Sequence, residues 1–548
     1  MGSISKVFGA AQGSRAAQSR LESRGTISGR NCAPRVTTIS RAPGRKNAAA
    51  AAIAALLCGP FAPGPSAAQA DPSDLDVGQR TAELLAEMIR IPSVNPPGGE
   101  AAVAERIAAE LAGAGLETRV FMTPREQPSD PARGAVWSRL PGRGDARPLI
   151  LLSHLDVVPA TAEEWEIPPF AGRIEDGWVH GRGALDAKGV TAVHVGALLE
   201  LARRPEPPAR DIILLATPDE ETGGQEGAEY IIRQFPELLG EAEFLLTEGG
   251  SIRPARSARE DIIAVPSMWG VTVTEKGPCW LELTTRGPAG HGSAPRANAA
   301  VPRLIEALDR VRRVETPIRV LDEVASMFRA LAPNAPEEDR AGFASLAESL
   351  ASNPSFRRRF LSNPGYNALV RNTLSITVLE GGSSTNVVPS LAKARLDVRL
   401  LPGERCETFV SSLAAVIADP AVEIKILLSF PSRSSPSDTR LFEAIERVAQ
   451  RDDPGALVVP RMIGGFTDAH WFRDQGIVAY GFVPRWLSRG DSQGVHGIDE
   501  RVSIANLQRG VLTLLAIVDE LEALTPSGEA ASGPDQTAPD DAGGKNGL

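Results

Sequence analysis

The sequence predicts an α/β fold in which a mainly parallel sheet is covered by helices and a ferredoxin-like α+β domain is inserted. The apolar runs 149–152, 212–216 and 244–246 are continuous, with a helical stretch at 190–202. Such runs are typical of parallel strands that are buried on both faces. The 548 residues, 42% hydrophobic and 23% charged, are enough for two globular domains.

The chain before the first apolar run predicts two helices. Apolar residues recur at helical spacing over 77–91 and over 100–113, and the second helix is ended by Gly113 and Gly115. Together with the later apolar runs, these helices define the first part of the larger domain, at residues 71–276.

The pattern changes near Gly277, where we place the inserted domain, residues 277–435. Its expected elements are, in order, strand 280–285, helix 301–311, strands 373–379 and 392–400, helix 408–417 and strand 422–428. This order is that of the split ferredoxin-like arrangement. Residues 317–371 look helical but have no place in that pattern, so we expect an extra lid or contact element. Residues 436–525 return to the larger domain as its second part.

The two ends of the chain have different compositions. Residues 1–70 carry nine Lys or Arg against one acid, then an apolar run at 48–57 and Ala68-Gln69-Ala70. This order is typical of a secretory signal, so we expect an exported, periplasmic or secreted protein that begins at Asp71. A transit peptide to an organelle matrix is the alternative. The Pro, Gly, Ser and Asp content of residues 526–548 predicts a disordered tail.

The charge and the cysteines limit the function further. Without residues 1–70 the net charge changes from -10 to about -18, which argues against nucleic-acid binding. No apolar stretch reaches the roughly 18 to 20 residues of a membrane span. Cys32 and Cys58 lie in the leader, and the residues before Cys58 disfavour a lipid attachment there. Cys279 and Cys406 remain as one candidate pair, either bonded or free.

Polar side chains follow the apolar runs at the points where the strands should end. The residues delivered in this way are His154 and Asp156, Asp186, Glu220 and Glu221, and Glu248, while His496 comes from near the end of the chain. Ligand sites in parallel sheets lie at the carboxyl ends of the strands. Histidine with several carboxylates and no cysteine suits zinc or a similar divalent ion.

Four motifs in this order resemble the zinc peptidase superfamily that includes aminoacylase-1, carboxypeptidase G, carboxypeptidase S and succinyl-diaminopimelate desuccinylase. They are Ser-His-Leu-Asp at 153–156, Gly-Arg-Gly-Ala-Leu-Asp-Ala-Lys-Gly at 181–189, Asp-Glu-Glu-Thr-Gly-Gly at 219–224 and Arg-Gly-Pro-Ala-Gly-His-Gly-Ser at 286–293. The resemblance covers nearly all of residues 75–523. It implies a zinc-exopeptidase-like catalytic domain and an inserted lid or dimerisation domain.

The resemblance also implies roles for individual residues. One zinc ion would be held by His154 and Glu248, a second by Glu221 and His496, with Asp186 as the bridge and cobalt or manganese as substitutes. Asp156 would fix the tautomer of His154, and Glu220 would be the general base. His291 would help bind the carbonyl oxygen, often from a partner subunit. The expected substrate contacts are Asn386, Arg399, Gly465, Thr467 and Asp468, and the peptide after Asp186 is often cis in the family.

These roles predict a di-zinc hydrolase that cleaves an amide bond beside a free carboxylate, as a peptide carboxypeptidase or an N-acyl amino acid hydrolase. A homodimer through the inserted domain is compatible with the resemblance. The alternative is a catalytically silent member that acts as a binding or scaffold protein. Structural roles also stay open for four residues: an internal hydrogen bond or salt bridge for Asn386 and Arg399, a place in the packed core for His194 and a turn contact for His180. His470 remains a candidate substrate contact.

Overall fold

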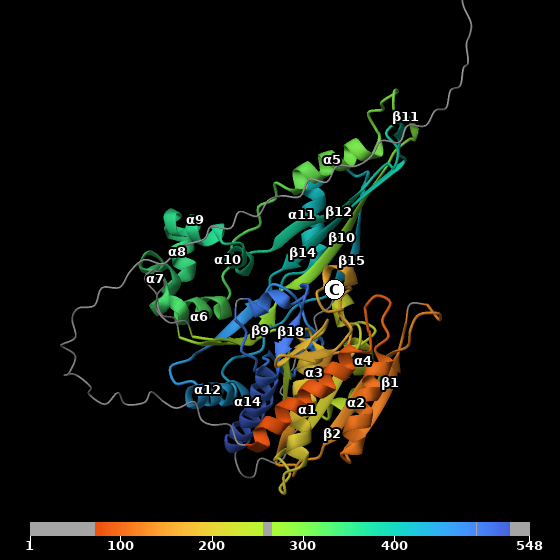
Figure 1. Cartoon of the computed structure of the whole chain (residues 1–548). Helices are drawn as coiled ribbons and strands as arrows, with labels where there is room; N and C mark the ends of the chain where they lie inside the picture. Colours follow the sequence, from red (N-terminus) through yellow and green to blue (C-terminus); the bar gives the residue numbers. More distant parts are fainter. Residues whose placement is uncertain (1–71, 126, 256–265, 489, 526–548) are drawn as a thin grey trace, which may run out of the picture. The chain divides into compact units, whose positions relative to one another are not determined.

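The computed structural model describes residues 72–125, 127–255, 266–488 and 490–525 (Figure 1). The leader predicted over residues 1–70 and the tail predicted over 526–548 lie outside the described residues. Among the helices that the structure describes, none is both long enough and apolar enough to cross a bilayer.

The larger sheet has nine strands and is parallel at its centre. Its order is β1 (Glu117–Thr123), β2 (Arg133–Leu140), β6 (Arg210–Thr217), β3 (Ala146–His154), β7 (Phe244–Thr247), β17 (Val478–Gly481), β9 (Met268–Glu275) and β16 (Leu457–Ile463), with β8 (Ser251–Arg253) beside β9. The neighbours β6, β3, β7 and β17 pair in parallel, whereas β1, β2 and β8 pair antiparallel. The predicted α/β class is confirmed, although the sheet is mixed and parallel mainly at its centre.

Helices cover both faces of this sheet because its central strands are apolar on both sides. Leu149 and Leu151 face one core and Ile150 and Leu152 face the other, all fully buried. The first core is closed by α1 (Pro72–Ile89), α2 (Ala101–Gly113), α3 (Lys188–Ala202), α12 (Arg440–Asp452) and α14 (Ile504–Ala523). The second is closed by α4 (Ala228–Gln234) and α13 (Ala469–Asp474). The three helices predicted at 77–91, 100–113 and 190–202 are α1, α2 and α3.

The inserted domain has the predicted ferredoxin-like topology. Its antiparallel sheet has the order β12 (Thr373–Glu380), β14 (Leu391–Leu400), β10 (Gly277–Arg286) and β15 (Val422–Ser429). Helices α5 (Ala300–Val311) and α11 (Cys406–Ile417) pack on one face of it. A short pair, β11 (Gly290–His291) with β13 (Val387–Val388), lies beyond the end of β10 (Figure 1).

Cys279 and Cys406 form a disulfide bond inside this domain. The bond joins β10 to the first residue of α11 across 127 positions of the sequence. Both cysteines are buried in the core between the sheet and the helices. The alternative of two free thiols, which the sequence left open, is therefore not what the structure shows.

The extra segment is helical, as predicted. It contains α6 (Asp322–Leu331), α7 (Glu337–Ala344), α8 (Leu346–Ser352), α9 (Pro354–Ser362) and α10 (Pro364–Leu369). Aromatic side chains, including Phe328 and Phe360 at 5.0 Å between ring centroids, form its core. This core continues onto Val459 and Met462 of β16, the last strand of the large sheet. The segment therefore covers a sheet edge, which would otherwise leave an apolar border open to solvent.

Candidate metal centre

Three neighbouring strands deliver the first group of site residues. Strand β3 pairs in parallel with both β6 and β7, so the carboxyl ends of the three strands meet at one edge of the sheet. His154 is the last residue of β3, and Glu248 directly follows β7. After β6 the chain turns at Asp219, whose φ of 76° is left-handed, into a short 3-10 helix that carries Glu220 and Glu221.

Asp186 and His496 reach the same edge on loops. Asp186 lies two residues before α3, in a peptide bond to Ala187 that is cis, as the resemblance implied. His496 lies in the loop that enters β18 (Arg501–Ser503), which pairs with β5 (Trp178–His180) of a small three-stranded sheet. Because β5 leads directly into the Asp186 loop, this small sheet ties the two loops together.

The side chains form two groups that share Asp186. His154 Nε2 lies 3.0 Å from Asp186 Oδ1 and 3.5 Å from Glu248 Oε1. His496 Nε2 lies 3.1 Å from Asp186 Oδ2 and 3.3 Å from Glu221 Oε1. In each group the candidate ligand atoms lie within 4.8 Å of one another. The two oxygens of Asp186 thus face different groups, which is the arrangement a bridging carboxylate requires.

The donor atoms fit two divalent cations. Glu221 is mostly buried, and its Oε1 accepts no hydrogen bond from the part of the chain that the structure describes. A buried carboxylate oxygen without a donor is costly, and a cation would satisfy it. Two imidazoles and three carboxylates, with no thiolate, match the ligand preferences of zinc.

Crowding and burial change the proton affinities of these groups. Burial, with the negative charge of Glu248, raises the pKa of Glu220 well above its usual value, and burial raises the pKa of Glu248 to about 7. Burial opposes the charging of His154, but Glu248 and hydrogen bonds with Asp156 and Asp186 raise its pKa well above 6.5. The close carboxylates of Asp186 and Glu221 raise the pKa of His496 to about 10.

Zinc binding to the metal-free protein at pH 7 is therefore expected to release protons. The pKa of His496 is raised to about 10, so this histidine holds a proton at pH 7, whereas a zinc ligand must be a neutral imidazole. The raised pKa of His154 acts in the same direction. The zinc affinity should rise with pH as these protons become easier to remove. Calorimetric titrations in two buffers of different ionisation enthalpy measure the number released. At least one proton per chain is expected, and a count of zero would contradict this electrostatic account.

Asp156 supports the site in two ways. The Nδ1 of His154 lies 3.0 Å from the main-chain oxygen of Asp156 and 3.5 Å from its carboxylate, which leaves Nε2 toward Asp186 and Glu248. The carboxylate of Asp156 also accepts the main-chain N–H groups of Glu220 at 3.2 Å and Glu221 at 3.0 Å. The sequence predicted only the contact between Asp156 and His154. In the structure the shorter of the two distances to His154 Nδ1 is that of the main-chain oxygen of Asp156 and not that of its carboxylate.

Glu500 is a supporting residue that the sequence analysis missed. It is fully buried, and it accepts hydrogen bonds from the main-chain N–H groups of Leu185 at 2.6 Å and Asp186 at 3.0 Å. It also pairs with the buried Arg182 at 2.8 Å. Glu500 therefore holds the loop of the proposed bridge. Its only signal in the sequence was its position four residues after His496.

His291 and Asn386 lie together, but in the inserted domain. The main-chain N–H of Gly292 donates to the carbonyl of Asn386 at 2.7 Å. The imidazole of His291 is exposed, and its Nδ1 is 2.8 Å from the hydroxyl of Ser293. The structure thus brings these two predicted residues to each other, without any described contact to the ligands of the metal centre.

Arg399 has an internal partner. It makes two hydrogen bonds with Asp397, at 2.7 and 3.1 Å, and its guanidinium lies over the rings of Trp280 and Phe466. The internal salt bridge that the sequence left open is therefore present. Phe466 belongs to the catalytic part of the chain, so Arg399 stands where the two domains meet.

The remaining predicted substrate residues are two buried side chains and an exposed glycine. Thr467 and Asp468 are buried, and they hydrogen-bond to Glu275 at 2.9 Å and Thr217 at 2.8 Å respectively. Burial raises the pKa of Asp468 to about 8. Gly465 is exposed. Thr467 and Asp468 thus make their described hydrogen bonds to buried residues of the protein.

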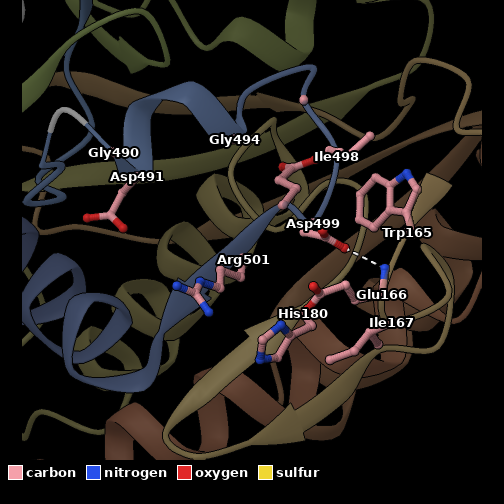
Figure 2. Close-up of a pocket in the computed structure, with 12 residues that line it drawn as sticks. Trp165, Glu166, Ile167, His180, Gly490, Asp491, Gly494, Ile498, Asp499 and Arg501 are labelled. Atoms are coloured by element: carbon pink, nitrogen blue, oxygen red, sulfur yellow. Dashed lines mark hydrogen bonds between the residues drawn. The ribbon is translucent and has the colours of Figure 1, made fainter. Parts of the chain in front are cut away.

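The other histidines have structural surroundings. Both ring nitrogens of His194 are buried on α3 and have no hydrogen-bond partner among the described residues, and burial lowers its pKa to about 3. His470 stacks on Phe430 at 3.6 Å between ring centroids. His180, on β5, lines a pocket of about 680 Å³ with Trp165, Ile167, Ile498 and Arg501 (Figure 2).

This pocket adjoins the loop of His496. Gly494 and Gly497, which flank that histidine, both belong to its lining. Figure 2 shows Asp499 beneath Ile498, accepting a hydrogen bond of 2.9 Å from the main-chain N–H of Glu166. The pocket contains none of the candidate metal ligands, so it is a neighbour of the centre and not part of it.

Comparisons with known proteins agree with the predicted resemblance. A family model described as peptidase family M20/M25/M40 matches residues 150–520. The chain is 31% identical over 368 residues to an N-fatty-acyl-amino acid synthase/hydrolase of Xenopus tropicalis, which covers 65% of this chain and 69% of that protein. It is 27% identical over 436 residues to the succinyl-diaminopimelate desuccinylase of Cereibacter sphaeroides, covering 78% of this chain and 94% of that protein.

Solved structures show the same fold. An M20 family metallo-carboxypeptidase from Sulfolobus solfataricus superposes with a TM-score of 0.62 at 19% identity, covering 81% of this chain and 99% of that one. Human carnosine dipeptidase 1 superposes with a TM-score of 0.57 at 16% identity, covering 82% and 99%. The predicted family is confirmed by the match over residues 150–520. The chain therefore belongs to peptidase family M20/M25/M40 and is a hydrolase of that family.

Proposed function

We propose that this protein is a di-zinc hydrolase that cleaves an amide bond beside a free carboxylate, in an N-acyl amino acid or at the end of a peptide. The observation that carries the proposal is the position of Asp186, whose two oxygens face His154 and His496 at 3.0 and 3.1 Å. Glu220 lies beside the first group, with its Oε2 3.9 Å from His154 Nε2.

The chemistry divides between the ions and the chain. When bound, two zinc ions supply Lewis acidity, which lowers the pKa of water to roughly 7 and stabilises negative charge on the attacked carbonyl. Glu220 takes the proton from the attacking water and gives it to the nitrogen of the leaving group, so that the amide bond breaks to an acid and an amine. Burial and the negative charge of Glu248 raise its pKa, which makes this carboxylate a stronger base than an exposed glutamate.

The substrate class draws support from the relatives. One is named for N-fatty-acyl-amino acids and another for succinyl-diaminopimelate, while the neighbour from Sulfolobus is named a carboxypeptidase. Cleavage of an amide beside a carboxylate is common to these names. We therefore expect both an acyl or peptidyl group and a carboxylate to be recognised.

The test is a substrate panel on protein loaded with two zinc ions per chain. The panel contains N-acetyl amino acids, N-fatty-acyl amino acids and dipeptides, each with a matched carboxamide in place of the free carboxylate. We expect hydrolysis of at least one class. For the matched carboxamide we expect kcat/KM to be lower by about 100-fold or more, because the charge-assisted contact with the carboxylate is lost. No hydrolysis with both sites filled would favour a catalytically silent binding protein.

We also propose a homodimer in which the inserted domain of one copy serves the site of the other. Strand β10 has ten residues and runs for about 33 Å, and His291 lies five residues past its end. His291 therefore lies far along the chain from Gly277, where the inserted domain begins, and a partner copy could receive it. Sedimentation velocity tests this, with a dimer expected at micromolar concentration and a monomer at odds with the proposal.

Export is supported by the disulfide. Bonds such as Cys279–Cys406 persist mainly in oxidising compartments, which include the periplasm and the exterior. We therefore propose that residues 1–70 direct export and are removed. Sequencing the mature N-terminus should find Asp71, and a mature chain that begins at Met1 or Gly2 would reject the proposal.

A further inference from the structure

Asn95 and Arg133 form a buried bracket beside the metal centre, and neither is a candidate ligand. Asn95 lies in the loop after α1, and Arg133 is the first residue of β2. Their exposed fractions are 2% and 3%. Burying a guanidinium is costly unless it is well paired. The partners of Asn95 and Arg133 therefore indicate which part of the site the two side chains hold in place.

Arg133 holds the turn that begins the catalytic 3-10 helix. Its Nη1 donates to Asp219 Oδ1 at 2.5 Å, and its Nη2 donates to Asn95 Oδ1 at 2.6 Å. Asp219 directly precedes Glu220 and has the left-handed φ of 76°. Aspartate adopts this conformation more readily than most residues other than glycine, and the contacts of the Asp219 side chain stabilise it here.

Asn95 joins this turn to the support of His154. Its Nδ2 donates to Asp156 Oδ2 at 2.9 Å and to Thr222 Oγ1 at 3.1 Å. Asp156 in turn holds the N–H groups of Glu220 and Glu221. The orientation of the Asn95 amide is fixed by its partners, because the opposite orientation would place its NH2 against the guanidinium of Arg133.

The bracket therefore fixes the base turn from two sides. Arg133 donates a hydrogen bond to Asp219 at the start of the turn. Asp156, which Asn95 orients, accepts hydrogen bonds from the main-chain N–H groups of the two residues that follow. A carboxylate placed about 1 Å away from its working position loses much of its effect on rate, so the anchor of the turn should matter for catalysis.

We propose that Asn95 and Arg133 are positioning residues, which set where the Glu220 carboxylate stands without touching substrate or metal. The inference rests on the proposed function, since Glu220 is the base in that mechanism. It predicts that loss of either side chain lowers kcat more than it raises KM and that both zinc ions remain bound.

The experiment compares Arg133→Met, the conservative Arg133→Lys and Asn95→Ala with a matched control, Arg139→Met. Arg139 lies on the same strand, is about half exposed and pairs with Asp211. For Arg133→Met and Asn95→Ala we expect kcat to fall about 10- to 100-fold, as for the loss of supporting partners at metal sites. KM should change less than about 3-fold, with zinc content as in the wild type and partial recovery in Arg133→Lys.

A second readout separates positioning from general destabilisation. If Arg133 acts through Glu220, then Arg133→Met should change kcat by less than about 2-fold in a Glu220→Gln background, because the group it positions is already lost. Hydrogen exchange of the amides of residues 218–224 should be faster in Arg133→Met, and not in Arg139→Met, even without substrate or metal.

Three results would overturn the inference: unchanged kcat in both Arg133→Met and Asn95→Ala, a loss of kcat explained by loss of zinc, or effects that multiply with those of Glu220→Gln. If Arg133→Met does not fold, Arg133→Lys and Asn95→Ala carry the same comparison. An inactive wild type with both zinc sites filled would instead remove the proposed function, so the two failures are distinguishable.

Discussion

Glu220→Gln should lower kcat about 10³-fold while zinc content stays at the wild-type value. The amide of glutamine has nearly the same shape as the carboxylate but cannot take a proton from water, and general-base catalysis contributes roughly 10² to 10⁴ in rate. Glu220 belongs to neither group of candidate ligands, which are completed by Glu221 and Glu248. KM should therefore change little.

Steady-state kinetics and elemental analysis of zinc on the same preparation test this prediction. A suitable control is Glu229→Gln, because Glu229 lies on α4 in an ion pair with Arg233 at 3.2 Å and takes no part in the centre. A Glu220→Gln enzyme with kcat within about 3-fold of the wild type would remove Glu220 as the base.

Asp186→Ala is expected to have the largest effect, with zinc content below one ion per chain and kcat/KM lowered roughly 10⁴-fold or more. Asp186 is the only residue common to both candidate groups. Its removal takes one ligand from each group and leaves His154 and His496 without their nearest carboxylate, at 3.0 and 3.1 Å.

Thermal denaturation with and without zinc gives a readout that does not need a substrate. A ligand that binds only the folded state raises Tm, so zinc should stabilise the wild type and stabilise Asp186→Ala much less. The control Asp519→Ala removes an exposed ion pair with Arg204 and should behave as the wild type. Full zinc stabilisation of Asp186→Ala would show that Asp186 is not the bridge.

Three candidate ligands, His154, Glu221 and Glu248, could be predicted because they follow apolar runs that are themselves clear. Asp186 and His496 lie on loops, and their roles came from the resemblance of the motifs. In the central strands, Leu149 and its neighbours are buried on both faces, so the run is continuous and its end marks the site. Strand β1 was missed because it is partly exposed along most of its length. Its pairing with β2 at the rim is one of the antiparallel pairings that make the sheet mixed.

The supporting residues Asn95, Arg133 and Glu500 could not be predicted, because their partners are distant in the sequence. Arg133 and Asp219 are 86 positions apart, and Arg182 and Glu500 are 318 apart. A buried Arg or Glu has no local pattern that distinguishes it from a surface charge. Arg399 shows the opposite case: a motif suggested a substrate contact, whereas the neighbouring Asp397 supplies an internal partner.

The central claim is that two cations meet at the carboxylate of Asp186. Anomalous diffraction at the zinc edge, from crystals of zinc-loaded protein, tests it most directly. The account predicts two peaks about 3.5 to 4 Å apart, one on each side of Asp186, the first beside His154 and the second beside His496. A single peak, or two peaks of which neither contacts Asp186, would contradict it.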